Sequence, residues 1–191
     1  GPPTHLVRWF ISREREEMLP KIPRAIVLGC KSALGCLYLA DKGCDVSGID
    51  TVQKALSRGR DIAAARGYNI SLHDESVCDP PSDLQGVFDF AFDRLTLGTE
   101  PKAQRAIRAA ASYLKPGGVL LTVHGKMAQN TSRELEEAAR ESAKRFEDSG
   151  LFTVMWAKPT SIELALSNGS WGSVHGWWAL MNRTELPCSA N

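Results

Sequence analysis

The sequence lacks the features that mark several specialised classes of protein. Its 191 residues contain no long apolar run, so we expect no helix that spans a membrane. The formal net charge is only +1, which gives no electrostatic reason for binding to nucleic acid or to an anionic membrane. No secretory signal is visible either, and we therefore expect a cytoplasmic protein.

The five cysteines also lack the spacing that structural zinc sites use. No two of them form a Cys-x-x-Cys pair, and none is grouped with nearby histidines. Their odd number disfavours a framework of disulfides. We therefore expect free thiols in a reducing compartment and no metal site.

What the sequence does contain is a regular alternation of apolar runs and amphipathic segments. Strand-like runs cover residues 25–28, 45–49, 69–72, 87–92, 119–123, 151–156 and 176–181. Helical patterns cover residues 5–19, the segment that ends at 42, and residues 52–66, 102–114 and 131–146. This order predicts an α/β fold with a doubly wound, Rossmann-like sheet of seven strands. The last two strands are joined without a helix, so we expect a mainly parallel sheet whose last strand is antiparallel.

Open sheets of this kind bind ligands beyond the C-terminal ends of their strands. The first such loop, Gly29 to Ala33, contains small residues that permit a close approach of the backbone, although Lys31 occupies a position where glycine is common. Asp50 ends the second strand about twenty residues later, where a carboxylate can accept hydrogen bonds from ribose hydroxyls. Alternatively, Asp50 or Thr51 could cap the helix that follows.

The loops after the third and fourth strands carry further candidates. Ser76 and Val77 could flank an adenine ring, or they could belong to a surface turn directed by Pro80-Pro81. Asp93 and Arg94 end the fourth strand, where two adjacent charges are costly unless they are paired or face a cleft. Arg94 could bind a carboxylate or orient a substrate, or it could form a structural ion pair.

These stretches resemble the thiopurine S-methyltransferase family, a group of class I methyltransferases. Residues 30–33 with 40–43 are similar to its "LCGKA…ADRG" segment, and residues 46–50 to its "VVGVE". Residues 69–79 resemble "NISL…SIFDL", and residues 88–94 resemble "YDxIWDR". The order and approximate spacing agree from residue 24 to residue 123. The Asp-Arg ending of the fourth strand is the most specific of these signs.

The resemblance implies a single methyltransferase-type domain over residues 1–191, with an N-terminal helix within 1–20 lying over the cofactor and substrate cleft. It implies S-adenosyl-L-methionine as the cofactor, with Asp50 on the ribose and Arg94 near the methionine end. The implied cofactor-binding residues are Leu28, Gly29, Cys30, Asp50, Ser76, Val77 and Arg94.

Methyl transfer from a sulfonium depends mainly on positioning, so it requires neither a triad nor a metal. A thiol acceptor needs little or no base, whereas a hydroxyl or an amine can need one. The candidate catalytic residues are Asp93, Arg94 and His124, and the candidate substrate contacts are Trp9, Trp171 and His175. Both histidines could instead be structural. Trp171 lies in a Gly/Ser-rich segment, 167–175, which we expect to be a mobile loop.

The favoured function is methyl transfer to a thiol, hydroxyl or amine of a small molecule, by a monomer or a homodimer. One alternative is a domain that binds S-adenosylmethionine without transferring its methyl group, either non-catalytic or using the sulfonium for charge stabilisation. A nicotinamide-dependent oxidoreductase is less favoured, because the glycine fingerprint is missing and the last strand is expected to be antiparallel.

Overall fold

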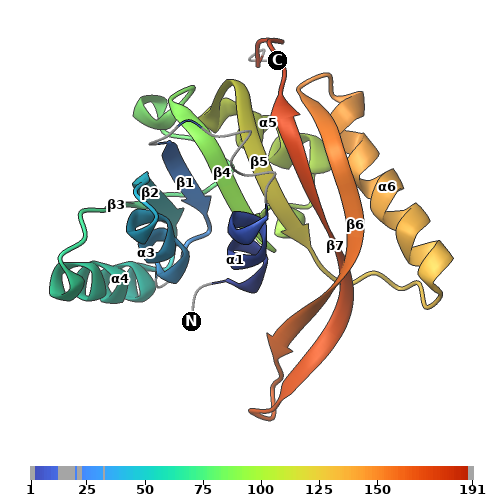
Figure 1. The fold of residues 1–191 in the computed structure, drawn as a ribbon, viewed down its shortest axis with the longest axis horizontal. Coiled ribbons are helices and arrows are strands. Elements are labelled where there is room, and N and C mark those ends of the chain that lie inside the picture. Colours follow the sequence, from blue (N-terminus) through green and yellow to red (C-terminus); the bar gives the residue numbers. More distant parts are fainter. Residues whose placement is uncertain (1–2, 13–19, 21–22, 32, 189–191) are drawn as a thin grey trace.

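The computed structural model describes residues 3–12, 20, 23–31 and 33–188, and every structural statement refers to these residues. Seven strands form one sheet in the order β3-β2-β1-β4-β5-β7-β6, with helices on both faces (Figure 1). The strands are β1 (Arg24–Leu28), β2 (Asp45–Asp50), β3 (Ser71–Asp74), β4 (Phe88–Arg94), β5 (Leu114–His124), β6 (Phe152–Ala165) and β7 (Trp171–Arg183). The helices are α1 (Thr4–Ile11), α3 (Leu34–Asp41), α4 (Gln53–Arg66), α5 (Ala103–Tyr113) and α6 (Ser132–Asp148), with 3-10 turns η1 (Ser82–Leu84) and η2 (Leu97–Thr99).

The pairing of the strands confirms the predicted sheet. β1 lies between β2 and β4, and the neighbouring strands from β3 to β5 are all parallel. β7 is antiparallel to both of its neighbours, β5 and β6. Ala25 to Leu28 of β1 are all buried, as expected for a strand that helices cover on both faces. The order of the strands reverses between β1 and β4, which makes this point the topological switch of the sheet.

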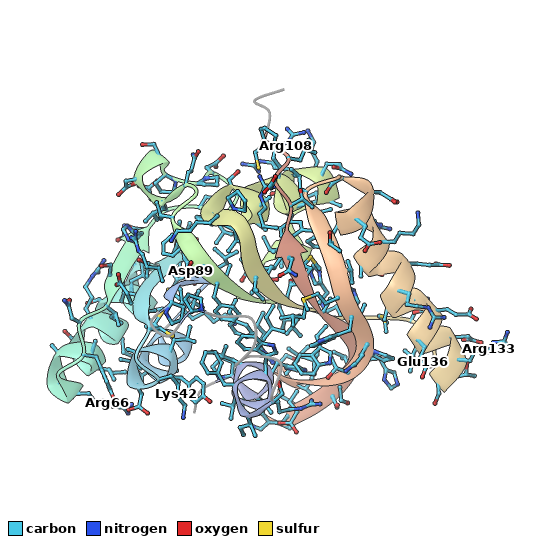
Figure 2. All side chains as sticks on the ribbon, turned by 45° about the horizontal axis from the view of Figure 1, so that its top comes forward. Lys42, Arg66, Asp89, Arg108, Arg133 and Glu136 are labelled. Carbon is cyan, nitrogen blue, oxygen red and sulfur yellow. The ribbon has the colours of Figure 1, made fainter. Side chains whose placement is uncertain are left out.

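Hydrophobic clusters fill both faces of the sheet. On one face, α1, α3 and α4 contribute residues such as Leu6 and Leu56. On the other face, α5 and α6 contribute residues such as Ile107 and Phe146. Charged side chains such as Arg133 on α6 project outward (Figure 2). None of the described helices is both long enough and apolar enough to cross a membrane.

The β6–β7 hairpin differs from the prediction, because its strands are much longer than 151–156 and 176–181. The two strands pair from Phe152↔Arg183 to Ala165↔Trp171, so much of the predicted loop 167–175 is strand. β5 pairs with β7 only as far as His124↔Trp177, and the rest of the hairpin projects past the sheet as a two-stranded arm (Figure 1). The arm alternates as a strand should, since Ile162 is buried between two exposed neighbours.

The N-terminal helix is shorter in the described structure than the predicted 5–19. α1 ends at Ile11, and residues 13–19 lie outside the described residues. The buried residues of α1 are His5, Leu6 and Trp9, which form one face of the helix toward the sheet. This face brings the N-terminal segment to the same edge of the sheet as the arm of the hairpin.

Candidate functional site

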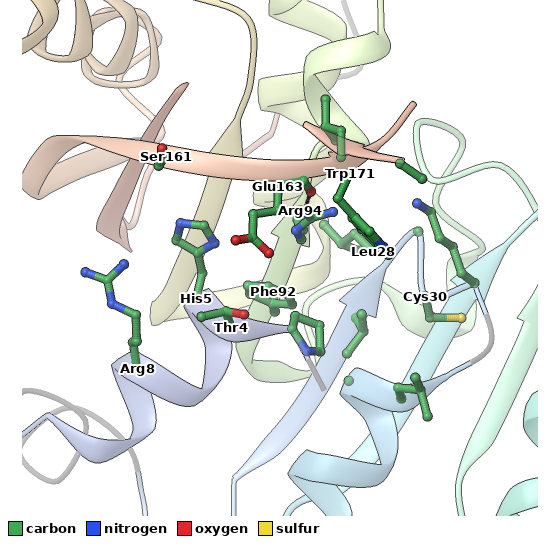
Figure 3. A pocket seen from close by; sticks show the side chains of 18 of the residues that line it. Thr4, His5, Arg8, Leu28, Cys30, Phe92, Arg94, Ser161, Glu163 and Trp171 are labelled. Carbon is green, nitrogen blue, oxygen red and sulfur yellow. Dashed lines mark hydrogen bonds between the residues drawn. The ribbon is translucent and has the colours of Figure 1, made fainter. Parts of the chain in front are cut away.

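A cavity of about 810 Å³ lies at the C-terminal ends of β1 and β4 (Figure 3). Its walls come from the β1–α3 turn, from α1 and from the arm of the β6–β7 hairpin. We call it the first cavity. It lies at the topological switch point, where open α/β sheets bind their ligands. Its volume is in the range of about 300–1,000 Å³ that is typical of pockets for small molecules.

The turn from Gly29 to Ala33 has a glycine-like backbone although only its first residue is glycine. The φ angles are 74° at Gly29, 49° at Lys31 and 68° at Ala33, all in the left-handed region that other residues disfavour. Gly29 has no room for a side chain, because an added Cβ would collide with the hydroxyl of Thr96. Gly29 therefore presents backbone without a side chain at the wall of the first cavity, and Lys31 and Ala33 hold strained left-handed conformations.

The carboxylate of Asp50 holds this turn in place. The backbone N–H of Lys31 donates to Oδ2 at 2.7 Å, and the N–H of Val52 donates to Oδ1 at 3.0 Å. Asp50 is only 9% exposed. The contact with Val52 matches the predicted capping role, whereas the contact with Lys31 places the carboxylate beside the wall of the first cavity. Each carboxylate oxygen can accept a further hydrogen bond, so Asp50 retains the capacity to bind ribose hydroxyls. That contact stays a prediction.

The two residues predicted to flank an adenine lie outside the lining of the first cavity. Ser76 is exposed. Val77 is buried, and its carbonyl oxygen accepts a hydrogen bond from the hydroxyl of Tyr113 at 2.6 Å. Both residues follow β3 at the edge of the sheet where Asp50 ends β2. Their role toward an adenine remains a prediction.

Arg94 reaches into the first cavity from the end of β4 (Figure 3). Its Nη2 donates to the backbone carbonyl of Glu163 on β6 at 3.0 Å, and partial burial lowers the pKa of its guanidinium. This bond uses one of five N–H donors, so others can bind an anionic group such as a carboxylate. Leu28, Gly29 and Cys30 line the same cavity.

His5 of α1 also lies in the wall of the first cavity and is absent from the predicted site (Figure 3). It is 4% exposed, and its Nε2 lies 2.8 Å from Oγ1 of Thr160. Burial, and then the charges of Arg8 and Arg94, lower the pKa of His5 to about 4, so its ring is neutral at pH 7. The sequence signal is weak, because His5 lies one turn before Trp9 on an apolar helix face, where a core position is the usual outcome.

The three predicted substrate contacts lie in three different environments. Trp9 is 1% exposed, and its ring stacks on Phe90 with the centroids 4.8 Å apart, which corrects its predicted place in the cavity wall. It is buried because α1 turns its apolar face to the sheet, where a large ring packs away from water. Trp171 lines the first cavity and is 73% exposed. His175 is exposed on β7 and lies outside this lining.

A second cavity, of about 780 Å³, lies beside the ends of β4 and β5 and is bounded by α5, α6 and the turns after both strands. The predicted catalytic residue His124 lines this second cavity and not the first. Its Nε2 lies 2.9 Å from Oγ1 of Thr122, and its ring stacks on Trp177 at 4.2 Å between centroids. The structure thus does not bring His124 together with Arg94, although Leu164 of β6 lines both cavities.

Asp93 is fully buried and lines neither cavity. Its Oδ1 accepts the backbone N–H groups of Thr96 and Leu97, each at 3.0 Å, and its Oδ2 accepts the hydroxyl of Thr122 at 2.7 Å. Burial raises the pKa of this carboxyl from 3.8 to about 6, although the three hydrogen bonds act in the opposite direction. The direct contacts of Asp93 are therefore with the protein.

Comparisons with known proteins bear on this arrangement. A family model described as a methyltransferase domain matches residues 25–118. The chain is 27% identical over 95 residues to a ubiquinone biosynthesis O-methyltransferase of Bordetella avium, a match that covers 50% of this chain and 39% of that protein. It is 36% identical over 86 residues to the N-methyltransferase sirN of Leptosphaeria maculans, with 41% of this chain and 30% of that protein covered. The matches thus span well under half the length of either relative.

Among solved structures, a SAM-dependent methyltransferase from Methanosarcina mazei superimposes with a TM-score of 0.71. The two chains are 19% identical, and the match covers 93% of this chain and 99% of that one. At this level of identity the likeness supports the fold alone. It extends beyond residues 25–118 to nearly the whole chain.

Proposed function

We propose that the protein transfers a methyl group from S-adenosyl-L-methionine to a small molecule. The match of residues 25–118 to a methyltransferase-domain model supports this proposal. The acceptor would be a thiol, a hydroxyl or an amine. The observation that carries the proposal is the first cavity, where bare backbone from the Gly29 turn and the cationic side chain of Arg94 face one space at the switch point of the sheet.

The residues around the first cavity fit the cofactor. The proposed contacts that line the first cavity are Leu28, Gly29, Cys30 and Arg94. The other proposed contacts, Asp50, Ser76 and Val77, lie at or after the ends of the neighbouring strands, outside that lining. Gly29 lets the ligand approach the backbone, Asp50 accepts hydrogen bonds from the ribose hydroxyls, and Arg94 pairs with the carboxylate of the methionine end. When bound, the cofactor supplies an electrophilic methyl group on a sulfonium.

The other walls of the first cavity would exclude water and orient the substrate. α1 and the hairpin arm would keep water away from the reacting groups, with the N-terminal segment covering the cleft of a single domain. Trp171 offers a flat apolar surface at the mouth, where it would contact the substrate. In-line displacement gains most of its rate from such positioning.

One observation favours a second candidate, a protein that binds the cofactor without transferring its methyl group. Lys31 and Ala33 occupy left-handed positions in the turn that glycine suits best. The strain is compatible with binding, since Asp50 holds the turn through the N–H of Lys31. Turnover would separate the two candidates, because only the first produces S-adenosylhomocysteine.

The test is calorimetric titration of the protein with S-adenosylmethionine, S-adenosylhomocysteine and NADH. We expect micromolar or tighter binding of the first two ligands and none of NADH. Asp50→Ala should weaken binding about 10- to 100-fold, since each hydrogen bond to a charged group contributes about 1.5–3 kcal/mol. Asp74→Ala is the matched control, because this exposed carboxylate ends the neighbouring strand and contacts Gln53.

Two results would contradict the proposal in different ways. Equal affinity of the Asp50→Ala variant and the unmodified chain would show that the ribose contact is wrong. If the unmodified chain binds neither sulfur ligand, the methyltransferase function itself fails. Because Asp50 also supports the turn, Asp50→Asn, which retains one acceptor oxygen, should be measured beside it for both affinity and melting temperature.

A further inference from the structure

The second cavity contains a polar group that the proposed cofactor site does not use. Its lining is largely apolar, with Ile107, Phe146 and Trp177 among its residues, and His124 is part of its wall. Leu164 lines the first cavity and the second, so the two spaces are neighbours at the C-terminal edge of the sheet. A group bound beside His124 would therefore share the residue Leu164 as a neighbour with the proposed cofactor site.

Hydrogen bonds determine which nitrogen of His124 carries the proton. The carboxylate of Asp93 can only accept, so the single hydroxyl proton of Thr122 points to it across 2.7 Å. Oγ1 of Thr122 must then accept from His124, whose Nε2 lies 2.9 Å away. The ring is therefore the tautomer with a proton on Nε2 and a free lone pair on Nδ1.

Nδ1 of His124 is open to a ligand. No described residue forms a hydrogen bond with it, and Gly98 leaves the space beside it clear, because a Cβ added there would lie 3.0 Å from Nδ1. The stacked ring of Trp177 holds the imidazole plane in place. A hydrogen-bond acceptor beside Ile107, Phe146 and Trp177 suits a ligand that has an apolar body and carries one donor.

We propose that Asp93, Thr122 and His124 form a proton relay that accepts the proton of a phenol-type hydroxyl bound in the second cavity. This inference rests on the proposed function and identifies the acceptor class. His124 would be the catalytic residue, because its Nδ1 touches the reacting group. Thr122 and Asp93 act through His124 and are positioning residues that also carry the proton onward.

The proton and the charges balance along this route. As the acceptor oxygen bonds to the methyl carbon, the carbon–sulfur bond breaks and its electron pair stays on sulfur. The hydroxyl proton moves to Nδ1 of His124, the Nε2 proton moves to Oγ1 of Thr122, and the hydroxyl proton of Thr122 moves to Oδ2 of Asp93. The products are the methyl ether, S-adenosylhomocysteine and a neutral carboxyl at Asp93.

The buried carboxyl of Asp93 is better suited than His124 to be the final proton acceptor of the relay. Burial lowers the pKa of His124 to about 4, so the imidazole alone is a poor final base, whereas the pKa of Asp93 is raised to about 6. The charged groups that share the second cavity with His124 are Glu100, Lys126 and Arg145. Methylation of a phenol should rise with pH through about 6, as Asp93 becomes able to accept the proton.

The first experiment reads the tautomer directly, without turnover. The histidine nitrogens of the ¹⁵N-labelled protein are observed by NMR at pH 7.5, and the spectrum of His124→Gln identifies the His124 signals. We expect the Nε2–H form in the unmodified chain. Asp93→Asn should give the Nδ1–H form, because an amide donates to Thr122 and reverses the direction of both bonds. Asp89→Asn, on the same strand and outside both cavities, should leave the tautomer unchanged.

The same spectra test binding at Nδ1 with phenol itself as the probe. Adding phenol should shift the Nδ1 signal of the unmodified chain. In Gly98→Ala, which retains all three relay residues, the added methyl should block that shift. The proposal is overturned by an Nδ1–H tautomer in the unmodified chain, by an unaltered tautomer in Asp93→Asn, or by the absence of a phenol-induced shift.

The second experiment compares phenol and thiophenol as acceptors, measured as formation of S-adenosylhomocysteine at pH 7.5. Asp93→Asn and His124→Gln should slow methylation of phenol by about 10²–10⁴-fold, as expected for loss of general base catalysis. Thiophenol ionises readily, so its methylation should fall less than about tenfold. An equal loss for both acceptors, or turnover of thiophenol alone by the unmodified chain, overturns the relay. Failure to bind S-adenosylmethionine overturns the proposed function and leaves the tautomer measurement as a separate result.

Discussion

Replacing Lys31 with glycine should stabilise the protein, although glycine usually destabilises one. Lys31 has a φ of 49°, and its side chain is exposed at the first cavity. A left-handed conformation costs an L residue about 1–2 kcal/mol, and glycine adopts it without that cost. The backbone N–H that donates to Asp50 is present in both variants, so the substitution removes strain and retains the hydrogen bond.

The size of the effect follows from two opposing terms. Removing the strain contributes about 1–2 kcal/mol, and the greater freedom of glycine in the unfolded chain opposes it by about 0.5–1 kcal/mol. The net gain in the free energy of unfolding should lie between about 0 and about 1.5 kcal/mol, with a central value of about 0.75 kcal/mol. For a chain of this size that gain raises the melting temperature by about 1–4 °C. Ala33→Gly should change stability little, because Ala33 is fully buried and loss of its methyl contacts offsets the relief of strain.

Urea unfolding at pH 7.5, followed by circular dichroism, measures this gain directly. Lys42→Gly is the matched control, since Lys42 is exposed but has a φ of −82° and should lose about 0.5–1 kcal/mol. If Lys31→Gly loses as much stability as Lys42→Gly, the turn does not have the strained conformation on which the argument depends. An unchanged melting temperature would mean that the two opposing terms are equal.

Trp9→Ala should destabilise the protein by about 3–5 kcal/mol in urea unfolding, because the buried ring stacks on Phe90, whereas the exposed Trp171→Ala should change stability by less than about 0.5 kcal/mol. Similar values for the two variants would place Trp9 at the surface. The raised pKa of Asp93 makes the folded chain retain a proton that the unfolded chain releases, so this group's contribution to stability should fall as pH rises from about 4 to about 6. His5 and His124 have pKa values lowered to about 4, so their contribution to stability rises with pH over the same range. The prediction therefore concerns the difference in stability between the unmodified chain and Asp93→Asn. Urea unfolding at several pH values should show that Asp93→Asn gains up to about 3 kcal/mol relative to the unmodified chain across this range, and a constant difference would contradict it.

The central fold could be predicted because its local signals agree with its long-range contacts. Apolar runs such as 25–28 alternate with helices that end at glycine, and Gly67 does end α4 in the left-handed conformation. The antiparallel last strand followed from the missing helix between the last two strands. The hairpin arm was harder to predict from the sequence. Gly172 and Gly176 resemble loop residues unless their pairing with Leu164 and Thr160 is known.

The candidate site was harder to predict, because it depends on which faces of the helices and strands pack against one another. Trp9 and Trp171 look equivalent in sequence, yet one is buried because α1 packs on the sheet and the other lies at a cavity mouth. Thr122 and His124 share a face of β5 because strand side chains alternate with a period of two. Their link to Asp93 depends on the β4–β5 register, which pairs Asp93 with Thr122 and has no local sequence signal.

The order of the last three strands has a consequence for synthesis on the ribosome. β7 lies between β5 and β6, and β6 pairs with no other strand among the described residues. The first five strands of a nascent chain can therefore pair with one another as they emerge. β6 has no partner in the sheet until β7 has been synthesised. During that interval the free edges of β5 and β6 are available to other chains, which makes the last part of translation the stage most exposed to aggregation.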